Sequence, residues 1–449
     1  MKNKLLFLTA ILGIILLPKV RAEEPAADTL QKIKADKIKT GWTFGAVPAI
    51  AFDSDVGFKY GGVVNLYYFG DGSTYPKYLH SIYLEWSRTT KGSGINQFIY
   101  DSKHLIPGIR VMAEASLLTE KALDFYGFNG YNSFYNPAFE TDNSAAYISR
   151  MYYRQDRKLT RIKADFIGDI KGTSLKWLAG IAYFHNKIGT VDIATLNKGK
   201  STDDLLPDTS LLYDQYVNWG IIPQDQKDGG TTNLLKAGLV YDTRDNEPNP
   251  MKGMWTDLQL LLAPGFMGND YAYTRLALTQ RQYFTLVPKR LSLAYRLSYQ
   301  AKLSGEMPFY MLPFVFNSAP NLTRDGLGGA KTIRGVLRNR IVGEDFVYGN
   351  IETRWKFYKN VIFNQNVYLA LSAFLDGGMV TGKYKLDLSG VPADEMYLFN
   401  ADKEALHLGY GAGLHVALNE NFVLAIDYGR AADPRDGDSG LYIGLNFLF

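Results

Sequence analysis

Few residues in this sequence have both the type and the spacing that chemistry at a site requires. The five histidines occur singly, without the spacing of a metal site or of a histidine that activates a nucleophile. Residues 53–57 read Asp-Ser-Asp-Val-Gly, which begins like a calcium loop but lacks the remaining ligands and the closing glutamate. We interpret this stretch as a hairpin turn. The sequence therefore predicts no metal site and no cofactor.

A serine in a tight turn is the best candidate for a nucleophile. Residues 437–440 read Gly-Asp-Ser-Gly, but no partner pattern surrounds Ser439, and turn chemistry alone explains these residue types. Neither a GxSxG motif nor a glycine-rich loop with a phosphate-binding lysine occurs. We therefore predict no catalytic residue and no enzymatic activity. A hydrolase site built from a few dispersed residues is the remaining enzymatic alternative.

One arginine is harder to assign to an ordinary surface. Residues 328–336 read GGAKTIRGV, and they lie in a long connection that we predict at about 305–342. In a solvated loop, Arg334 would need no partner. A guanidinium drawn into an interior with little water needs a carboxylate, and its planar fork favours a bidentate pair. The elements around the loop decide which case applies.

Those elements alternate apolar and polar residues with a period of two, which is typical of β-strands. In residues 290–304, Leu, Tyr and Ala alternate with Arg, Ser, Gln and Lys. The same alternation places Glu352 and Asp376 on the polar faces of two later strands. These stretches run for roughly ten to fifteen residues, whereas most strands of soluble proteins have about five or six. Tilted membrane-spanning strands need about 9 to 11 residues, so the apolar face is predicted to meet lipid and the polar face to line a lumen.

The fold class that follows is all-β: a transmembrane antiparallel β-barrel of about 16 strands, with residues 144–170 counted as one long strand. Long and short connections alternate along the chain, as they do between the external loops and periplasmic turns of such barrels. The longest external connections are predicted at 120–143, 189–230, 305–342 and 381–406. Both ends of the barrel domain then lie in the periplasm.

The chain ends support export to the bacterial outer membrane. Residues 1–22 have the basic start, apolar run and small-residue cleavage site of a signal peptide. They are followed by a short periplasmic segment at 23–40 and a barrel domain at 41–449. No cysteine is available for a disulfide framework. Without the four basic residues of the signal, the charge is near neutral, so we expect lipid as a partner and no nucleic acid.

Several motifs in order resemble the BamA, TamA and FhaC superfamily of outer-membrane assembly and translocation barrels, the bacterial surface antigen barrels. Gly-Gly followed by Ile333-Arg334-Gly335 is similar to the signature of that family's sixth external loop. Other matching stretches are YDTRDN from 241 with Pro250 and Gly253, GNIETR from 349, FLDGG from 374, FYGFNG from 125 and residues 41–70. The resemblance spans the barrel and is most specific in its C-terminal half.

The resemblance implies that the sixth loop folds into the lumen and that Arg334 pairs with an acid on the inner wall. We therefore expect Asp376 as its first partner and Glu352 as its second. It also implies that Phe447 and Phe449, on one face of an alternating last strand, act as a C-terminal assembly signal. Val336 stands where the family usually carries an aromatic residue, and 23–40 is too short for a periplasmic POTRA domain.

The function implied is assistance in the insertion, assembly or translocation of proteins at the outer membrane. Client strands would be added at a weak junction between the first strand and the last. The expected partners are other outer-membrane proteins or a POTRA-bearing assembly factor. The alternative is a channel or binding barrel without POTRA domains and without insertase activity, because a fold does not fix a function.

Overall fold

A computed structural model describes residues 37–319, 325–399 and 402–449. The predicted signal peptide at 1–22, and most of the segment at 23–40, lie outside these residues. No helix in the described part of the chain has the length and apolarity to cross a membrane.

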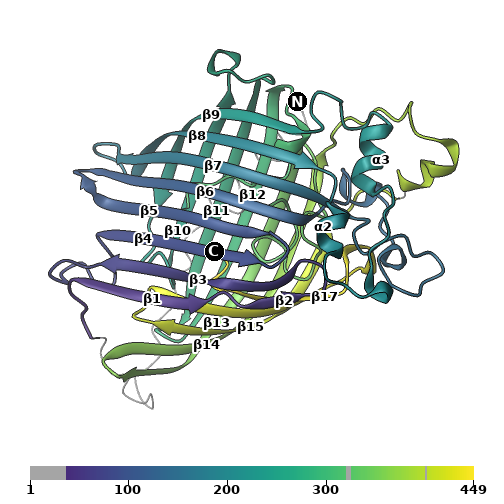
Figure 1. The fold of residues 1–449 in the computed structure, drawn as a ribbon. Coiled ribbons are helices and arrows are strands. Elements are labelled where there is room, and N and C mark those ends of the chain that lie inside the picture. The colour runs from purple at the N-terminus through teal and green to yellow at the C-terminus, as the bar shows by residue number, and fades with distance from the viewer. Residues whose placement is uncertain (1–36, 320–324, 400–401) are drawn as a thin grey trace.

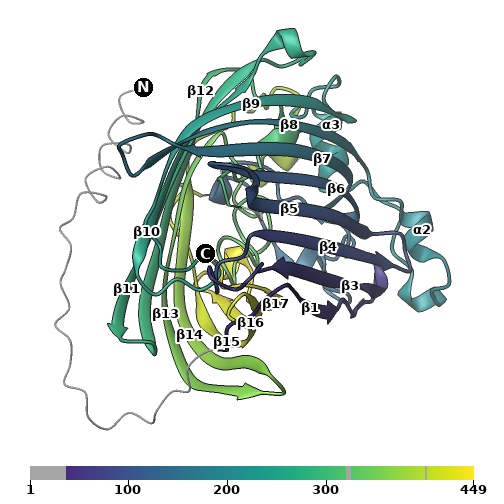
Figure 2. The same cartoon turned by 90° about the vertical axis from the view of Figure 1, so that its left-hand side faces the viewer.

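Antiparallel strands form one sheet that curls around into a barrel (Figures 1 and 2). β1 and β2 pair with successive stretches of β3, and the Ala49 amide between them donates to the Gly61 carbonyl. They act as one strand that is interrupted after Pro48, which has no amide hydrogen to donate. Counted in this way the strands occupy sixteen positions, which confirms the predicted fold class. The bounds are β1 (Trp42–Pro48), β2 (Ala51–Asp53), β3 (Gly57–Tyr68), β4 (His80–Thr89), β5 (Gly94–Ile106), β6 (Ile109–Asp124), β7 (Arg154–Asp169), β8 (Leu175–Gly189), β9 (Gly229–Asp242), β10 (Gly253–Ala263), β11 (Tyr273–Val287), β12 (Leu291–Gly305), β13 (Asp345–Ile362), β14 (Gln365–Gly382), β15 (His407–Leu418), β16 (Phe422–Ala431) and β17 (Ser439–Leu445).

The two faces of the sheet follow the alternation of the sequence. On β12 the polar set is buried inside the barrel, whereas its leucines are less covered; Arg296, Ser298 and Gln300 belong to the buried set. On β13 and β14, Ile351 and Leu375 are exposed on the outer face, and their neighbours Glu352 and Asp376 are buried on the inner face. The inner wall is therefore polar, as predicted.

Short turns connect the strands at one end of the barrel, which we call the turn end. β13 passes to β14 through Phe363 and Asn364, and β15 passes to β16 through 419–421. Both Phe363 and Asn364 have positive φ, as do Asn419 and Glu420, and two such residues in succession are typical of type I′ hairpins. These tight turns fix the register of each hairpin and hence which side chains face inward.

Side chains join the first and last strands of the sheet near the turn end. Tyr67 packs with Phe69 and Phe422, and Val47 and Leu445 pack against this group. The Tyr67 hydroxyl donates to the Asn421 carbonyl at 3.0 Å, and the Asn421 amide group donates to the Pro76 carbonyl at 2.7 Å. The β3–β4 turn is thereby fastened to the β15–β16 turn.

Long connections gather at the opposite end, the loop end, where Figure 1 also shows α2 (Ile193–Asn197) and α3 (Leu212–Asn218). Four of these connections, 125–153, 190–228, 306–344 and 383–406, contribute buried residues to one cluster, which we call the loop cap. Its aromatic members include Phe125, Tyr126, Phe128, Tyr152, Tyr153, Tyr213, Tyr216, Phe309, Tyr310 and Phe399. Ring pairs such as Phe125 with Tyr216, at 5.3 Å between centroids, hold separate loops together.

Two boundary predictions are wrong. The strand expected at 144–170 begins only at Arg154, because Tyr152 and Tyr153 turn into the loop cap, where burial outweighs the strand pattern. The last strand ends at Leu445, because Asn446 adopts a φ of 67° and reverses the alternation of the residues that follow.

The loop cap also holds a carboxyl group that titrates near neutral pH. Burial and the nearby Asp124 raise the pKa of Glu140 to about 7 against the opposing effect of Arg154. Between its ordinary pKa of 4.5 and 7, folded Glu140 keeps a proton that the unfolded chain has released. Stability should therefore fall as pH rises through this window and level off above it. Thermal unfolding of the wild type and Glu140→Gln at pH 5 to 8 checks this: the difference between the two should change with pH, and a constant difference contradicts it.

Candidate functional site

Loop six is the connection 306–344 between β12 and β13, and its described residues, 306–319 and 325–344, fold into the lumen. Its inner part is closed on itself by the isolated bridge between Leu327 and Ile341 and by a hydrogen bond from the Gly329 amide to the Val336 carbonyl. The wall holds it from outside: the Asn350 side chain donates to the Thr332 carbonyl at 2.7 Å, and Arg296 donates to the Lys331 carbonyl at 3.1 Å. The tip of the loop is therefore presented to the wall in one fixed position.

Arg334 lies at this tip and is fully buried. Its Nε and Nη2 donate to the two carboxylate oxygens of Asp376 at 2.8 and 3.1 Å, and its backbone amide donates to the same group at 3.0 Å. Nη1 donates to Glu352 at 2.8 Å and to Asp427 at 3.2 Å. The guanidinium also stacks over the Phe374 ring at 3.4 Å. The structure thus brings Arg334 together with both acids that the sequence proposes and with a third.

These acids come from strands whose register lines them up. Asn350 of β13 lies opposite Asp376 of β14, and Glu352 lies opposite Phe374, so both acids and the ring face the lumen in adjacent rows. Burial would lower the pKa of Arg334, but Glu352 and Asp376 raise it well above its ordinary value. The guanidinium accordingly stays charged, and the bidentate pair is the strong form of such a contact.

Glycines let the loop tip approach the wall backbone to backbone. A Cβ on Gly409 of β15 would lie 2.0 Å from the Arg334 carbonyl oxygen, and one on Gly429 of β16 would lie 2.8 Å from the Arg334 carbonyl carbon. Gly335 has a φ of 97°, and a Cβ there would lie 2.4 Å from the Arg430 carbonyl carbon. We call this contact surface, with the three acids, the loop-six seat.

The neighbours of Arg334 are packed on both sides of the seat. Ile333 and Val336 are buried in a cluster with Phe346 and Tyr348, so the valine that replaces the expected aromatic residue still fills an apolar site. The Gly335 amide donates to the Tyr442 hydroxyl of β17 at 3.0 Å. The tip therefore contacts the last strand as well as β13, β14 and β16.

Phe447 and Phe449 lie inside the barrel rather than on the outer face with Leu441 and Ile443. Both views place the C-terminal end within the outline of the barrel (Figures 1 and 2). The correction follows from the positive φ at Asn446, whose amide donates to the Val423 carbonyl at 2.7 Å. Their role as an assembly signal stays a prediction.

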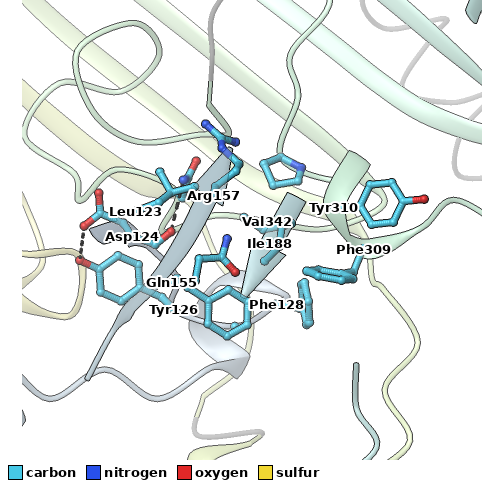
Figure 3. Close-up of a pocket in the computed structure, with 14 residues that line it drawn as sticks. Leu123, Asp124, Tyr126, Phe128, Gln155, Arg157, Ile188, Phe309, Tyr310 and Val342 are labelled. Atoms are coloured by element: carbon cyan, nitrogen blue, oxygen red, sulfur yellow. Dashed lines mark hydrogen bonds between the residues drawn. The ribbon is translucent and has the colours of Figure 1, made fainter. Parts of the chain in front are cut away.

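A small cavity adjoins the loop cap near loop six (Figure 3). It has a volume of about 20 Å³, room for roughly one water molecule. Figure 3 shows Phe128, Phe309 and Val342 on one side and Gln155 and Arg157 on another. It is too small for an organic substrate. Among the residues that the structure describes, no group of three or more His, Cys, Asp or Glu could hold a metal ion.

The arrangement is an ionic clamp rather than a reaction centre. Three of its contacts were not predicted from the sequence, those with Asp427, Phe374 and Tyr442. Asp427 could have been found, because its neighbours Ile426 and Tyr428 belong to the larger apolar residues of the outer face, which places Asp427 on the inner face of β16. Tyr442 could not, because its contact depends on the path of the loop.

A family model described as the Omp85 superfamily domain matches residues 120–449. No curated protein matches the chain. Among solved structures, BamA from Haemophilus ducreyi lacking POTRA domains 1–3 is similar at 16% identity and a TM-score of 0.47, over 91% of this chain and 69% of that one. CdiB from Escherichia coli is similar at 11% identity and a TM-score of 0.49, over 91% of this chain and 61% of that one.

Proposed function

Because the chain belongs to the Omp85 superfamily, we propose that it resides in a bacterial outer membrane and assists the insertion, assembly or translocation of other proteins there. On this proposal, the turn end faces the periplasm and the loop cap faces the exterior. Client polypeptides would pair with the edges of the first and last strands, since exposed backbone groups template strand addition.

The observation that carries the proposal is the reach of the loop-six seat. Arg334 contacts acids on β13, β14 and β16, and its neighbour Gly335 contacts β17. A single loop tip therefore fixes the wall up to the last strand. Clients would pair with the edge of β17. A loop that holds β17 from inside can keep this strand in place while the strand paired with its outer edge changes from β1 to a client.

Site-specific photocrosslinking in cells tests the proposal. A photoreactive residue at Phe44 of β1 or Ile443 of β17, both exposed on the outer face, should form adducts with other outer-membrane barrel proteins during their assembly. Leu375 of β14 is the matched control, because it is exposed on the same face in the middle of the sheet. Adducts confined to the two edge positions support the proposal.

Two other outcomes would contradict the proposal. Equal adducts at all three positions would mean random collision in the membrane. No client adduct at either edge, with the barrel normally assembled, would favour a channel or binding barrel.

A further inference from the structure

The chain end, residues 446–449, forms a compact lumenal segment that we call the tail. Phe447 stacks on His415 at 4.3 Å between centroids and packs with Tyr368 and Val423. Phe449 packs with Tyr283 and Ala294 on the wall. Both rings are almost completely buried. The tail therefore occupies a defined position on the inner wall.

Arg354 of β13 is the centre of the tail contacts. Its Nη2 donates to the Phe449 carbonyl at 2.8 Å, and its guanidinium lies 4.4 Å from the Phe447 ring centroid and 5.0 Å from that of Phe449. Its Nε donates to the Oε1 of Glu352 at 2.8 Å. Arg354 thus contacts the tail through its Nη2 and the loop-six seat, at Glu352, through its Nε.

Glu352 completes the connection. Its Oε1 accepts from Arg354 and its Oε2 accepts from Arg334, each at 2.8 Å. The orientation of this buried carboxylate is set by two arginines that belong to different parts of the chain. Loss of the tail would remove the Phe447 and Phe449 rings from the Arg354 guanidinium and leave that of Tyr283, which is farther away at 5.8 Å. A displaced Arg354 would no longer hold the orientation of Glu352.

The sequence of the tail is also compatible with a second conformation, in which the tail continues β17 as a strand. Leu441, Ile443, Leu445, Phe447 and Phe449 alternate as one apolar face of a longer strand. In the structure this alternation is reversed at a single residue, Asn446, and asparagine tolerates both backbone regions. Rotation there would extend β17 past Phe422 and carry both rings out of the lumen.

We propose that Arg354 is a positioning residue that couples the tail to the loop-six seat: the tucked tail holds Arg354 and Glu352 in place for Arg334, and withdrawal of the tail loosens loop six. In the cell, withdrawal of the tail would let the last strand lengthen to pair with a client, and this part of the inference rests on the proposed function. The coupling itself is a property of the isolated chain.

A cysteine reporter measures the coupling, since the sequence contains no cysteine. Val336→Cys places a thiol in loop six at a position that is 1% exposed, so a maleimide should label it only when the loop leaves its seat. In purified barrel, Phe447→Ala with Phe449→Ala should raise the labelling rate about tenfold, given the loss of two cation–π contacts. Arg354→Gln should do the same. Ile443→Ala, on the exposed outer face of β17, is the matched control and should leave the rate within about twofold.

The combination of changes separates coupling from general damage. If the tail acts through Arg354, the tail changes should add less than about twofold in the Arg354→Gln background, because linked residues are not additive. Leu196→Cys, buried in a separate cluster, should stay unlabelled throughout. The inference is overturned if the labelling of Val336→Cys does not change, or if the effects of the tail changes and of Arg354→Gln on its labelling rate multiply. It is also overturned if Leu196→Cys becomes labelled to the same extent. No client is present, so failure here leaves the proposed function standing, and failure of the crosslinking leaves the coupling standing.

Discussion

Replacing Arg334 with alanine is expected to release loop six from the lumen wall and to destabilise the barrel by about 3 to 5 kcal/mol, the usual effect of removing one partner of a buried ion pair. The change leaves Asp376 without its bidentate partner and removes the Arg334 contacts of Glu352 and Asp427, while Glu352 keeps its hydrogen bond from Arg354. It also removes the ring contact with Phe374. Arg334→Lys keeps the charge but cannot reproduce the fork, so an intermediate loss is expected.

Unfolding of the purified protein in denaturant, together with limited proteolysis of loop six, measures the effect. The matched control is Arg430→Ala on β16, whose pair with Asp438 has side chains 59% and 81% exposed. Such an exposed pair contributes about 0 to 1 kcal/mol. The importance of the seat is contradicted if the two alanine variants have the same stability and the same pattern of cleavage.

Replacing Gly409 with valine should prevent loop six from seating while it leaves the three acids and Arg334 in the chain. The new Cβ would lie 2.0 Å from the Arg334 carbonyl oxygen, and a backbone atom cannot rotate away as the end of a flexible side chain can. Overpacking of this kind costs typically about 1 to 3 kcal/mol, and displacement of the loop would add part of the Arg334 loss.

The same proteolysis assay checks this second result, with Gly189→Val as its control. Gly189 ends β8, and a Cβ there would meet no atom within 4 Å. We expect rapid cleavage within loop six for the Gly409 variant and a wild-type pattern for the Gly189 variant. If loop six stays protected from cleavage in the Gly409 variant, β15 can move away from the Arg334 backbone to admit the new side chain, and the prediction is wrong.

Alternation alone predicted the inner and outer faces of the wall, because a strand that separates two media must change polarity at every residue. That rule placed Glu352 and Asp376 in the lumen before any contact was known, and the resemblance to a loop signature supplied Arg334. The pairing of Arg334 with these acids therefore needed two kinds of information, one local and one drawn from a family.

The features that the sequence did not predict depend on contacts between distant segments. Tyr152 and Tyr153 continue a strand pattern, yet they turn into the loop cap because aromatic partners from other loops are available there. The tail has the pattern of a strand, yet Arg354 and His415 offer its rings a site inside. A period-two pattern reports which residues share a face but not where the strand stops.

The loop cap lies across the loop end of the barrel. A polypeptide that entered the lumen from the turn end would meet two obstacles: the loop-six seat, where Arg334 is held by three acids, and the aromatic side chains of the loop cap. Leaving straight ahead would require both to be dismantled together. On the proposed function, a client that pairs with the outer edges of β1 and β17 would have to displace neither the loop cap nor the seat.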